Sequence, residues 1–153
     1  MFPTKILLAT DNSPGTQAAT EAAAELAVDT ESELYVMRSV SLEIGPPYPA
    51  LATKDRVEEL LERWKLRALV ALDEQVGLVE KLRGSVAGSY YKEGRLDREA
   101  VRLGEELEVG LIVVGGRELG GIWKTLARFP PFFGNSAERT LDRARCPVLV
   151  IRT

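Results

Sequence analysis

The chain has 153 residues, of which 45% are hydrophobic and 28% charged, and its net charge is -3 at pH 7. These values indicate one globular domain that can bury its own core, without the basic face that broad nucleic-acid binding needs. The sequence has no histidine and a single cysteine. It therefore excludes Ser-His-Asp and Cys-His catalysis, histidine-ligated metals, internal disulfides and multi-cysteine zinc sites.

The start of the chain and its hydropathy predict a cytoplasmic protein. Residues 1–5 (MFPTK) lead directly into a strand and lack the layout of a signal peptide. No apolar run approaches the roughly 20 residues that a membrane span requires. We therefore expect a single domain over residues 1–153, with neither nucleic acid nor a membrane among its partners.

The first part of the chain predicts a strand, a helix and a second strand. Residues 6–9 (ILLA) form a short continuous apolar run, which is typical of a buried strand. A helix start follows, with Ser13 as the N-cap and Pro14 at the first helical position. Small apolar residues then recur at helical spacing: Ala19, Ala22, Ala23, Leu26 and Ala27. The second strand covers residues 34–37 and continues to Val40.

The middle of the chain predicts a loop, a long helix and a weaker strand. Residues 45–49 (GPPYP) cannot form regular structure. A helix is expected from about residue 53 to about residue 75. Its buried stripe is expected to contain Val57, Leu60, Leu61, Trp64, Ala68, Ala71 and Leu72. Residues 84–91 contain two glycines and predict a strand near an edge of the sheet, ended by Gly94.

The last part of the chain predicts two helices and two strands. The first helix covers residues 96–108, and the apolar strand 111–114 follows it. The second helix starts near residue 136, and the strand 148–151 closes the chain. The residues expected to face inward from these helices are Ala100, Val101, Gly104, Leu107, Ala137, Leu141 and Ala144. We expect Cys146 to be a buried small apolar residue rather than a reactive thiol.

The alternation of strands and helices predicts a mostly parallel sheet with helices on both faces. Ligands of such sheets bind at the carboxyl ends of the strands, where the strand order reverses. Asp11 follows the first strand, and the glycine-rich residues 115–121 (GGRELGG) follow the fourth. Glycines let the backbone approach a ligand, and the helix start near Gly134 offers unpaired N–H groups. These features predict an anion site.

Two common phosphate-binding motifs do not fit this region. Gly116 and Gly121 have the first spacing of a P-loop, but residues 122–123 separate Gly121 from the following Lys124. The dinucleotide fingerprint G-x-G-x-x-G is absent from residues 10–15, where it should follow the first strand.

Three segments together resemble the universal stress protein family, and the resemblance covers essentially the whole chain. They are residues 9–13 (ATDNS), 112–121 (IVVGGRELGG) and 146–151 (CPVLVI), and residues 136–151 resemble the family's C-terminal signature. The resemblance implies a three-layer α/β/α sandwich of the adenine nucleotide alpha hydrolase-like type. Its five-stranded parallel sheet would have the order 3-2-1-4-5. It also implies a homodimer, formed through the last strand from Val148 to Ile151.

The resemblance further implies binding of ATP or AMP, with Mg²⁺ accompanying ATP. The family's motif G-x2-G-x9-G-[ST] holds phosphates and ribose, and an aspartate after strand one contacts adenine. Asp11 matches that aspartate, Gly115 the first glycine and Gly134 the third. The expected nucleotide-binding residues are Ala9, Thr10, Asp11, Ser39, Gly115, Gly116, Arg117, Gly134, Asn135 and Ser136. No catalytic residue and no metal ligand is predicted.

The chain departs from the family's motif at several positions. Glu118 occupies the second glycine position, residues 119–133 form a spacer longer than nine, and Asn135 replaces Ser or Thr. Strand two ends in Arg38-Ser39, where the family more often has an apolar residue. A carboxylate at position 118 would repel a phosphate charge by about 1 kcal/mol at ~4 Å in water and by more at lower dielectric.

These departures leave alternative hypotheses open. In one, the protein binds no nucleotide and the altered loop with its aromatic run, Phe129 to Phe133, serves protein contacts. In another, the protein hydrolyses ATP slowly, which rests on family analogy because no residue is an evident base. Two of the expected binding residues also have purely structural alternatives. Asp11 would only shape its turn through Asx-type bonds, and Asn135 with Glu138 would form a capping pair.

Overall fold

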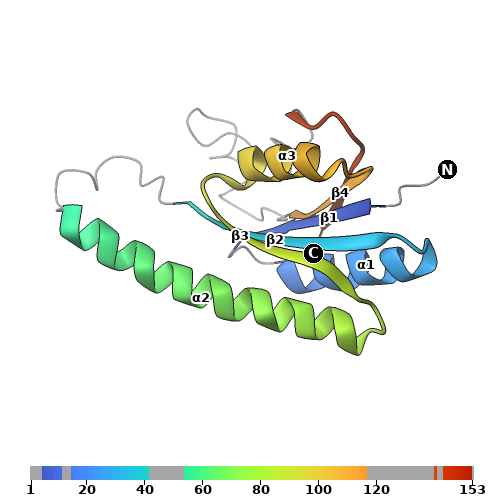
Figure 1. Cartoon of the computed structure of the whole chain (residues 1–153), viewed down its shortest axis with the longest axis horizontal. Helices are drawn as coiled ribbons and strands as arrows, with labels where there is room; N and C mark the ends of the chain where they lie inside the picture. Colours follow the sequence, from blue (N-terminus) through green and yellow to red (C-terminus); the bar gives the residue numbers. More distant parts are fainter. Residues whose placement is uncertain (1–4, 12–14, 42–53, 117–139, 141–142, 153) are drawn as a thin grey trace, which may run out of the picture.

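A computed structural model of the chain describes residues 5–11, 15–41, 54–116, 140 and 143–152 (Figure 1). The strands are β1 (Lys5–Thr10), β2 (Glu33–Val40), β3 (Val86–Glu93), β4 (Leu111–Gly116) and β5 (Val148–Arg152). The helices are α1 (Thr16–Asp29), α2 (Lys54–Lys81) and α3 (Leu96–Leu107). The strands form one parallel sheet in the order β3-β2-β1-β4-β5, which confirms the predicted topology.

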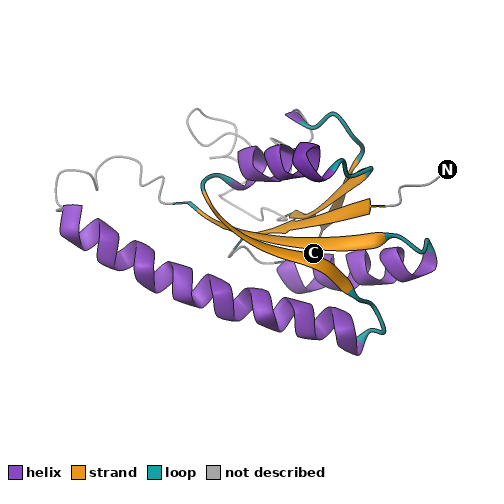
Figure 2. Ribbon diagram, in the orientation of Figure 1, coloured by secondary structure: helices purple, strands orange, loops and turns teal. Residues whose placement is uncertain are grey.

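Helices cover both faces of the sheet, as Figures 1 and 2 show. The alternate residues Ile6 and Leu8 of β1 pack with α1 and α2 on one face, and Leu7 and Ala9 pack with α3 on the other. All four side chains are fully buried, so β1 reads as a continuous apolar run instead of an alternating one. The prediction of a buried central strand is confirmed.

The start of α1 differs from the prediction. The helix begins at Thr16 and its N-cap is Gly15, whose left-handed φ of 95° suits glycine, so the expected capping by Ser13 is wrong. Pro14 and Ser13 themselves lie outside the described residues. The helix closes onto this turn because the amide of Ala19 donates to the carbonyl of Gly15 at 3.0 Å.

The long helix α2 continues beyond the predicted end at Gln75 to Lys81. Val79 is fully buried in this extension, and its burial is worth about 1.5–3 kcal/mol, more than the roughly 1 kcal/mol that Gly77 costs inside a helix. In the expected stripe only Ala68 and Leu72 are buried. Trp64 is partly exposed, which corrects its placement in the core.

The strands β3, β4 and β5 also refine the predictions. Strand β3 forms one edge of the sheet, as predicted, and Gly94 follows it with a φ of 145°. Strand β4 includes Gly115 and Gly116, which pair with Ile151 and Arg152 of β5, so the first two glycines belong to the strand and not to the loop. The parallel pairing with β5 extends β4 beyond the apolar run.

A buried carboxylate connects α3 with the segment before β5. Asp97 is 1% exposed and accepts hydrogen bonds from Arg95 Nε at 3.0 Å and Arg95 Nη2 at 2.9 Å. Arg143 lies 46 positions further along the chain, and its Nε is 3.3 Å from Asp97 Oδ2. We call these three residues the Asp97 cluster. It fixes the start of α3 against the last part of the chain.

The segment before β5 is described at residue 140 and from residue 143 on. Thr140 and Arg143 have helical conformation, while Ala137 and Leu141 lie outside the described residues. Ala144 and Cys146 are partly buried against the α3 face of the core, and burial raises the pKa of the Cys146 thiol. In the part of the chain that the structure describes, no helix has the length and apolarity to span a membrane.

Candidate functional site

The ends of β1 and β4 lie next to each other at the carboxyl edge of the sheet. Ala9 of β1 pairs with Val114 of β4, and the strands are parallel, so both strands end at the same edge of the sheet. A Cβ atom built on Gly115 would lie 3.3 Å from the carbonyl oxygen of Gly15 and 3.8 Å from the Cβ of Ala19. The turn after strand one therefore meets β4 at Gly115, whereas residues 117–121 of the glycine-rich segment lie outside the described residues.

The turn after β1 is held by its own side chains. The hydroxyl of Thr16 donates to the carbonyl of Asp11 at 3.1 Å, and the hydroxyl of Thr20 donates to the carbonyl of Thr16 at 2.7 Å. These bonds fix the backbone on both sides of residues 12–14. Asp11 is partly exposed, which leaves its carboxylate at the surface of this edge.

The structure brings together six of the ten predicted nucleotide-binding residues at this edge. Ala9, Thr10 and Ser39 are buried in the strands, whereas Asp11 and Gly115 are partly exposed and Gly116 ends β4. The other four residues lie outside the described residues: Arg117, Gly134, Asn135 and Ser136. The aromatic run from Phe129 to Phe133 lies outside them too. The roles of all ten residues as ligands of a nucleotide stay predictions.

A buried polar network underlies this edge and centres on Gln75 of α2. Gln75 Nε2 donates to Thr10 Oγ1 at 3.1 Å and to Thr20 Oγ1 at 3.2 Å, and Gln75 Oε1 accepts from Arg38 Nη1 at 3.0 Å. Thr10 Oγ1 in turn donates to the carbonyl of Met37 at 3.0 Å. We call Thr10, Thr20, Arg38 and Gln75 the Gln75 network. It joins β1, β2, α1 and α2 where the two strands end.

Arg38 gives the edge a buried positive charge. It is 8% exposed, and burial lowers the pKa of its guanidinium, while the nearby carboxylates of Asp11 and Glu74 act in the opposite direction. Because Arg38 pairs with Thr10 across β1 and β2, its charge lies directly beside the residue that precedes Asp11. Where β1 and β2 end, the described residues thus place the Arg38 cation beneath the surface and the Asp11 carboxylate near it.

Gln75 is the residue of this region that the sequence prediction missed. It was expected to end the helix, and a terminal position gives no reason to bury an amide. The burial of Gln75 could have been inferred from helical spacing. Gln75 lies three residues after Leu72 and four before Val79, on the same side of α2. Extending the apolar stripe to Val79 would have placed Gln75 in the core.

The described residues give the site a positioning role and supply no evident catalytic group. They contain no group of three or more Cys, Asp or Glu side chains that could hold a metal ion. What they offer is a partly exposed Asp11, a close backbone approach between Gly15 and Gly115, and a fixed polar support under the end of β1. Such an arrangement suits a ligand that is bound by backbone groups and one carboxylate.

Comparison with known proteins identifies the family of this fold and site. The model of the universal stress protein family matches residues 3–152. The chain belongs to this family. Universal stress protein MJ0531 of Methanocaldococcus jannaschii is 28% identical to it over 148 residues, which cover 97% of this chain and 81% of that protein.

Solved structures of universal stress proteins share the fold. UspA from Lactobacillus plantarum is 25% identical, with a TM-score of 0.75 and coverage of 99% of both chains. A universal stress protein solved in complex with cAMP is 18% identical, with a TM-score of 0.71 and coverage of 100% of this chain and 99% of that one. At that identity the second likeness shows the fold alone.

Proposed function

We propose that this universal stress protein binds an adenine nucleotide, ATP or AMP, at the carboxyl edge where β1 and β4 meet. The observation that carries the proposal is the contact between the Gly15 turn and Gly115, beside the partly exposed Asp11. The existence of a family member in complex with cAMP supports the choice of an adenine nucleotide. In this assignment Asp11 accepts from the base, and the backbone at Gly115 and Gly116 approaches the phosphates.

The polar support beneath the edge favours a preorganised site. The Gln75 network fixes the ends of β1 and β2 before a ligand arrives, which lowers the ordering cost of binding. The charge of Arg38 offsets that of Asp11, so a nucleotide with several negative charges meets less repulsion there. Mg²⁺ would arrive with ATP, since it is usually held largely by phosphates and water.

Calorimetry with ATP, ADP and AMP, each with and without Mg²⁺, tests the proposal. We expect heat of binding with at least one nucleotide and a loss of about tenfold to a hundredfold in affinity for Asp11→Ala, as removal of a charged hydrogen-bond acceptor predicts. Asp73→Ala, an exposed carboxylate of α2, is the matched control and should bind as the wild type does. Absence of heat with every nucleotide at high micromolar protein would reject the proposal.

We also propose that the protein is a cytoplasmic homodimer formed through β5. This strand is an edge of the sheet, and its Leu149 is 38% exposed, so it offers both unpaired backbone groups and an apolar side chain. Sedimentation of the wild type and of Leu149→Glu tests this. A dimer that dissociates in the variant is expected, and a wild-type monomer at micromolar concentration would contradict the proposal.

A further inference from the structure

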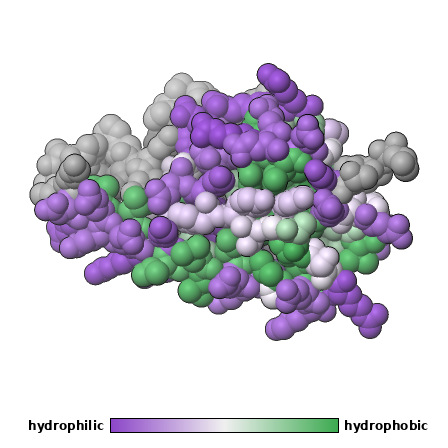
Figure 3. Space-filling view, viewed as in Figure 1, coloured by the Kyte–Doolittle hydropathy of each residue, from purple (hydrophilic) through white to green (hydrophobic). Residues whose placement is uncertain are grey.

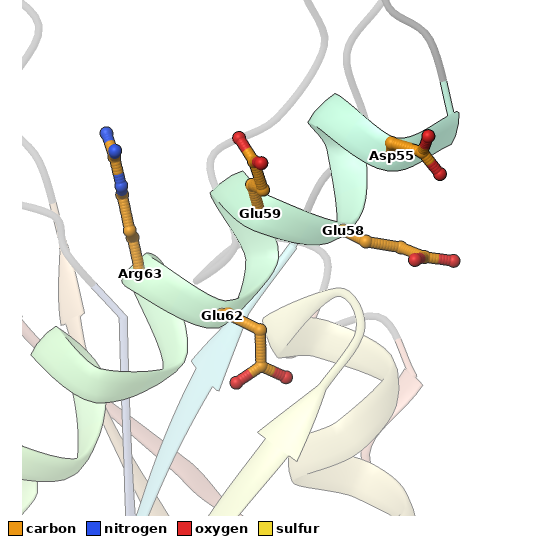
Figure 4. Close-up of a pocket in the computed structure, with 5 residues that line it drawn as sticks. All are labelled: Asp55, Glu58, Glu59, Glu62 and Arg63. Atoms are coloured by element: carbon orange, nitrogen blue, oxygen red, sulfur yellow. The ribbon is translucent and has the colours of Figure 1, made fainter.

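Gln75 is the one polar side chain among residues 55–81 of α2 that the fold buries, with 6% exposure. The charged residues of the first turns of this helix instead face outward, and Figure 3 shows hydrophilic residues on the surface there. Figure 4 shows their side chains projecting from the helix: Asp55, Glu58, Glu59, Glu62 and Arg63. A buried amide costs free energy unless it is hydrogen-bonded, so its partners decide what Gln75 contributes.

The two protons of this amide are bound on both sides of the turn after β1. Nε2 lies 3.1 Å from Thr10 Oγ1, in the residue before Asp11, and 3.2 Å from Thr20 Oγ1 in α1. Thr20 in turn donates to the carbonyl of Thr16 at 2.7 Å, and Thr16 donates to the carbonyl of Asp11 at 3.1 Å. A single side chain of α2 therefore reaches the backbone on both sides of residues 12–14.

Arg38 determines which way this amide points. A guanidinium has donors only, so Oε1 of Gln75 must face Arg38 Nη1, which lies 3.0 Å away. The hydroxyl of Thr20 donates to the carbonyl of Thr16, so its oxygen accepts and must face Nε2 of the amide. Both contacts require the same orientation of Gln75. Thr20 is fully buried and Arg38 is 8% exposed, so the network holds this orientation away from bulk water.

We propose that Gln75 is a positioning residue of the nucleotide site and sets its affinity by holding the turn after β1 in place. The inference rests on the proposed binding of a nucleotide at this edge. The turn contacts β4 closely, since a Cβ atom built on Gly115 would lie 3.3 Å from the carbonyl oxygen of Gly15. A displacement of the turn would move Asp11 and Gly15 relative to Gly115, and ordering it upon binding would cost affinity. Gln75 acts through the turn, because its own side chain is buried.

Removal of the hydrogen bonds without a large change in shape tests the proposal, by calorimetry with ATP and with AMP. Gln75→Met keeps a side chain of similar length but donates to neither threonine, and we expect nucleotide affinity to fall about tenfold. Thr20→Val removes only a fully buried hydroxyl and should weaken binding about threefold. Wild-type affinity in Gln75→Met would overturn the proposal.

The variant Val79→Ala is the matched control for a general loss of stability. Val79 lies one turn after Gln75 on the same side of α2 and is fully buried, but it takes no part in the Gln75 network. The control should lower the midpoint of urea denaturation and leave nucleotide affinity unchanged. An equal loss of affinity in Val79→Ala and Gln75→Met would show that affinity follows stability, and would overturn the positioning role.

The double variant Gln75→Met/Thr20→Val measures the coupling between the two side chains. Because both single changes remove the same hydrogen bond, the combined loss of affinity should be smaller than the product of the two single losses. Losses that multiply would contradict a path from Gln75 to the turn through Thr20.

Amide hydrogen exchange of the unliganded protein separates this inference from nucleotide binding itself. The amide of Ala19 donates to the carbonyl of Gly15 at 3.0 Å, so its exchange rate reports on the closure of α1 onto the turn. We expect this amide to exchange about tenfold faster in Gln75→Met than in Val79→Ala. A wild type that binds neither nucleotide would reject the proposed function, and the exchange rates would then decide the role of Gln75 alone. Equal exchange in the two variants would overturn that role.

Discussion

Two buried polar clusters lie on opposite faces of the sheet and are built from different chemistry. On the α3 face, the Asp97 cluster is ionic, and its arginines reach solvent, with side-chain exposures of 19% for Arg95 and 47% for Arg143. On the α1 and α2 face, the Gln75 network is made of one amide, two hydroxyls and a buried guanidinium.

The Asp97 cluster links α3 to the segment before β5, whereas the Gln75 network supports the candidate site. The Asp97 cluster joins segments distant in sequence, and solvent still reaches its cations, so its disruption should lower stability without touching the carboxyl edge at β1. The Gln75 network lies directly beneath Thr10 and beside Asp11, so its disruption should alter stability and the site together.

The largest effect is expected for Asp97→Ala. The variant removes the buried carboxylate that accepts two hydrogen bonds from Arg95 and pairs with Arg143, and loss of these charge-assisted bonds should lower the free energy of unfolding by about 3 kcal/mol, measured by urea denaturation. Arg143→Ala should cost at most about 1 kcal/mol, because that side chain is half exposed. A loss for Asp97→Ala no greater than that for Arg143→Ala would show that the cluster contributes little.

The variant Gln75→Leu should lower the free energy of unfolding by about 2 kcal/mol. Leucine fits the space but removes the acceptor for Arg38 Nη1 and the donor to Thr10 and Thr20, within a buried environment. The double variant with Arg38→Met should cost less than the sum of the two single variants, since no buried charge is then left behind. Additive losses would argue against a coupled network.

The variant Gly115→Ala tests how closely the two segments of the site approach. A methyl group there would lie 3.3 Å from the carbonyl oxygen of Gly15, so the backbone must shift, and we expect a loss of about 1–2 kcal/mol in stability. The matched control is Gly77→Ala, which meets nothing within 4 Å and should stabilise α2 by about 0.5–1 kcal/mol. Equal effects of the two variants would refute the close approach.

The smallest effect concerns Tyr91 on the edge strand β3, on the α2 side of the sheet. Burial and the nearby Glu93 raise its pKa to about 12 from the ordinary value of 10.0. The folded state therefore holds this proton more tightly than the unfolded state. Stability from this group is fully present below pH 10 and is lost as the pH rises toward 12.

Removal of the hydroxyl isolates this contribution. The difference in urea midpoint between the wild type and Tyr91→Phe should be constant below pH 9 and should shift in favour of the variant at pH 11. The same difference at both pH values would show that the pKa of Tyr91 is not raised in the folded protein.

The central strands were predictable from sequence because their signal is local. Residues 6–9, 34–37 and 111–114 are continuous apolar runs, and only burial on both faces of a sheet accommodates them. The position of Asp11 at the end of one such run, and of Gly115 after another, followed from the topology of parallel sheets. For this reason the edge that carries the proposed site could be predicted.

The polar clusters could not be predicted because they depend on contacts between distant segments. Nothing near Gln75 in the sequence indicates Thr10, 65 positions away, and nothing near Asp97 indicates Arg143. The extension of α2 past Gly77 was missed for a related reason, since the burial of Val79 that stabilises it depends on contacts with other elements. The family resemblance favours an apolar residue at position 38, so the burial of an arginine there could not be predicted from it.

A crystal structure of the protein with ATP or AMP tests the proposed nucleotide site most directly. The proposal predicts density for the base beside Asp11, at the ends of β1 and β2, and for the phosphates over Gly115 and Gly116. A nucleotide bound elsewhere, or no nucleotide at this edge at saturating concentration, would contradict it.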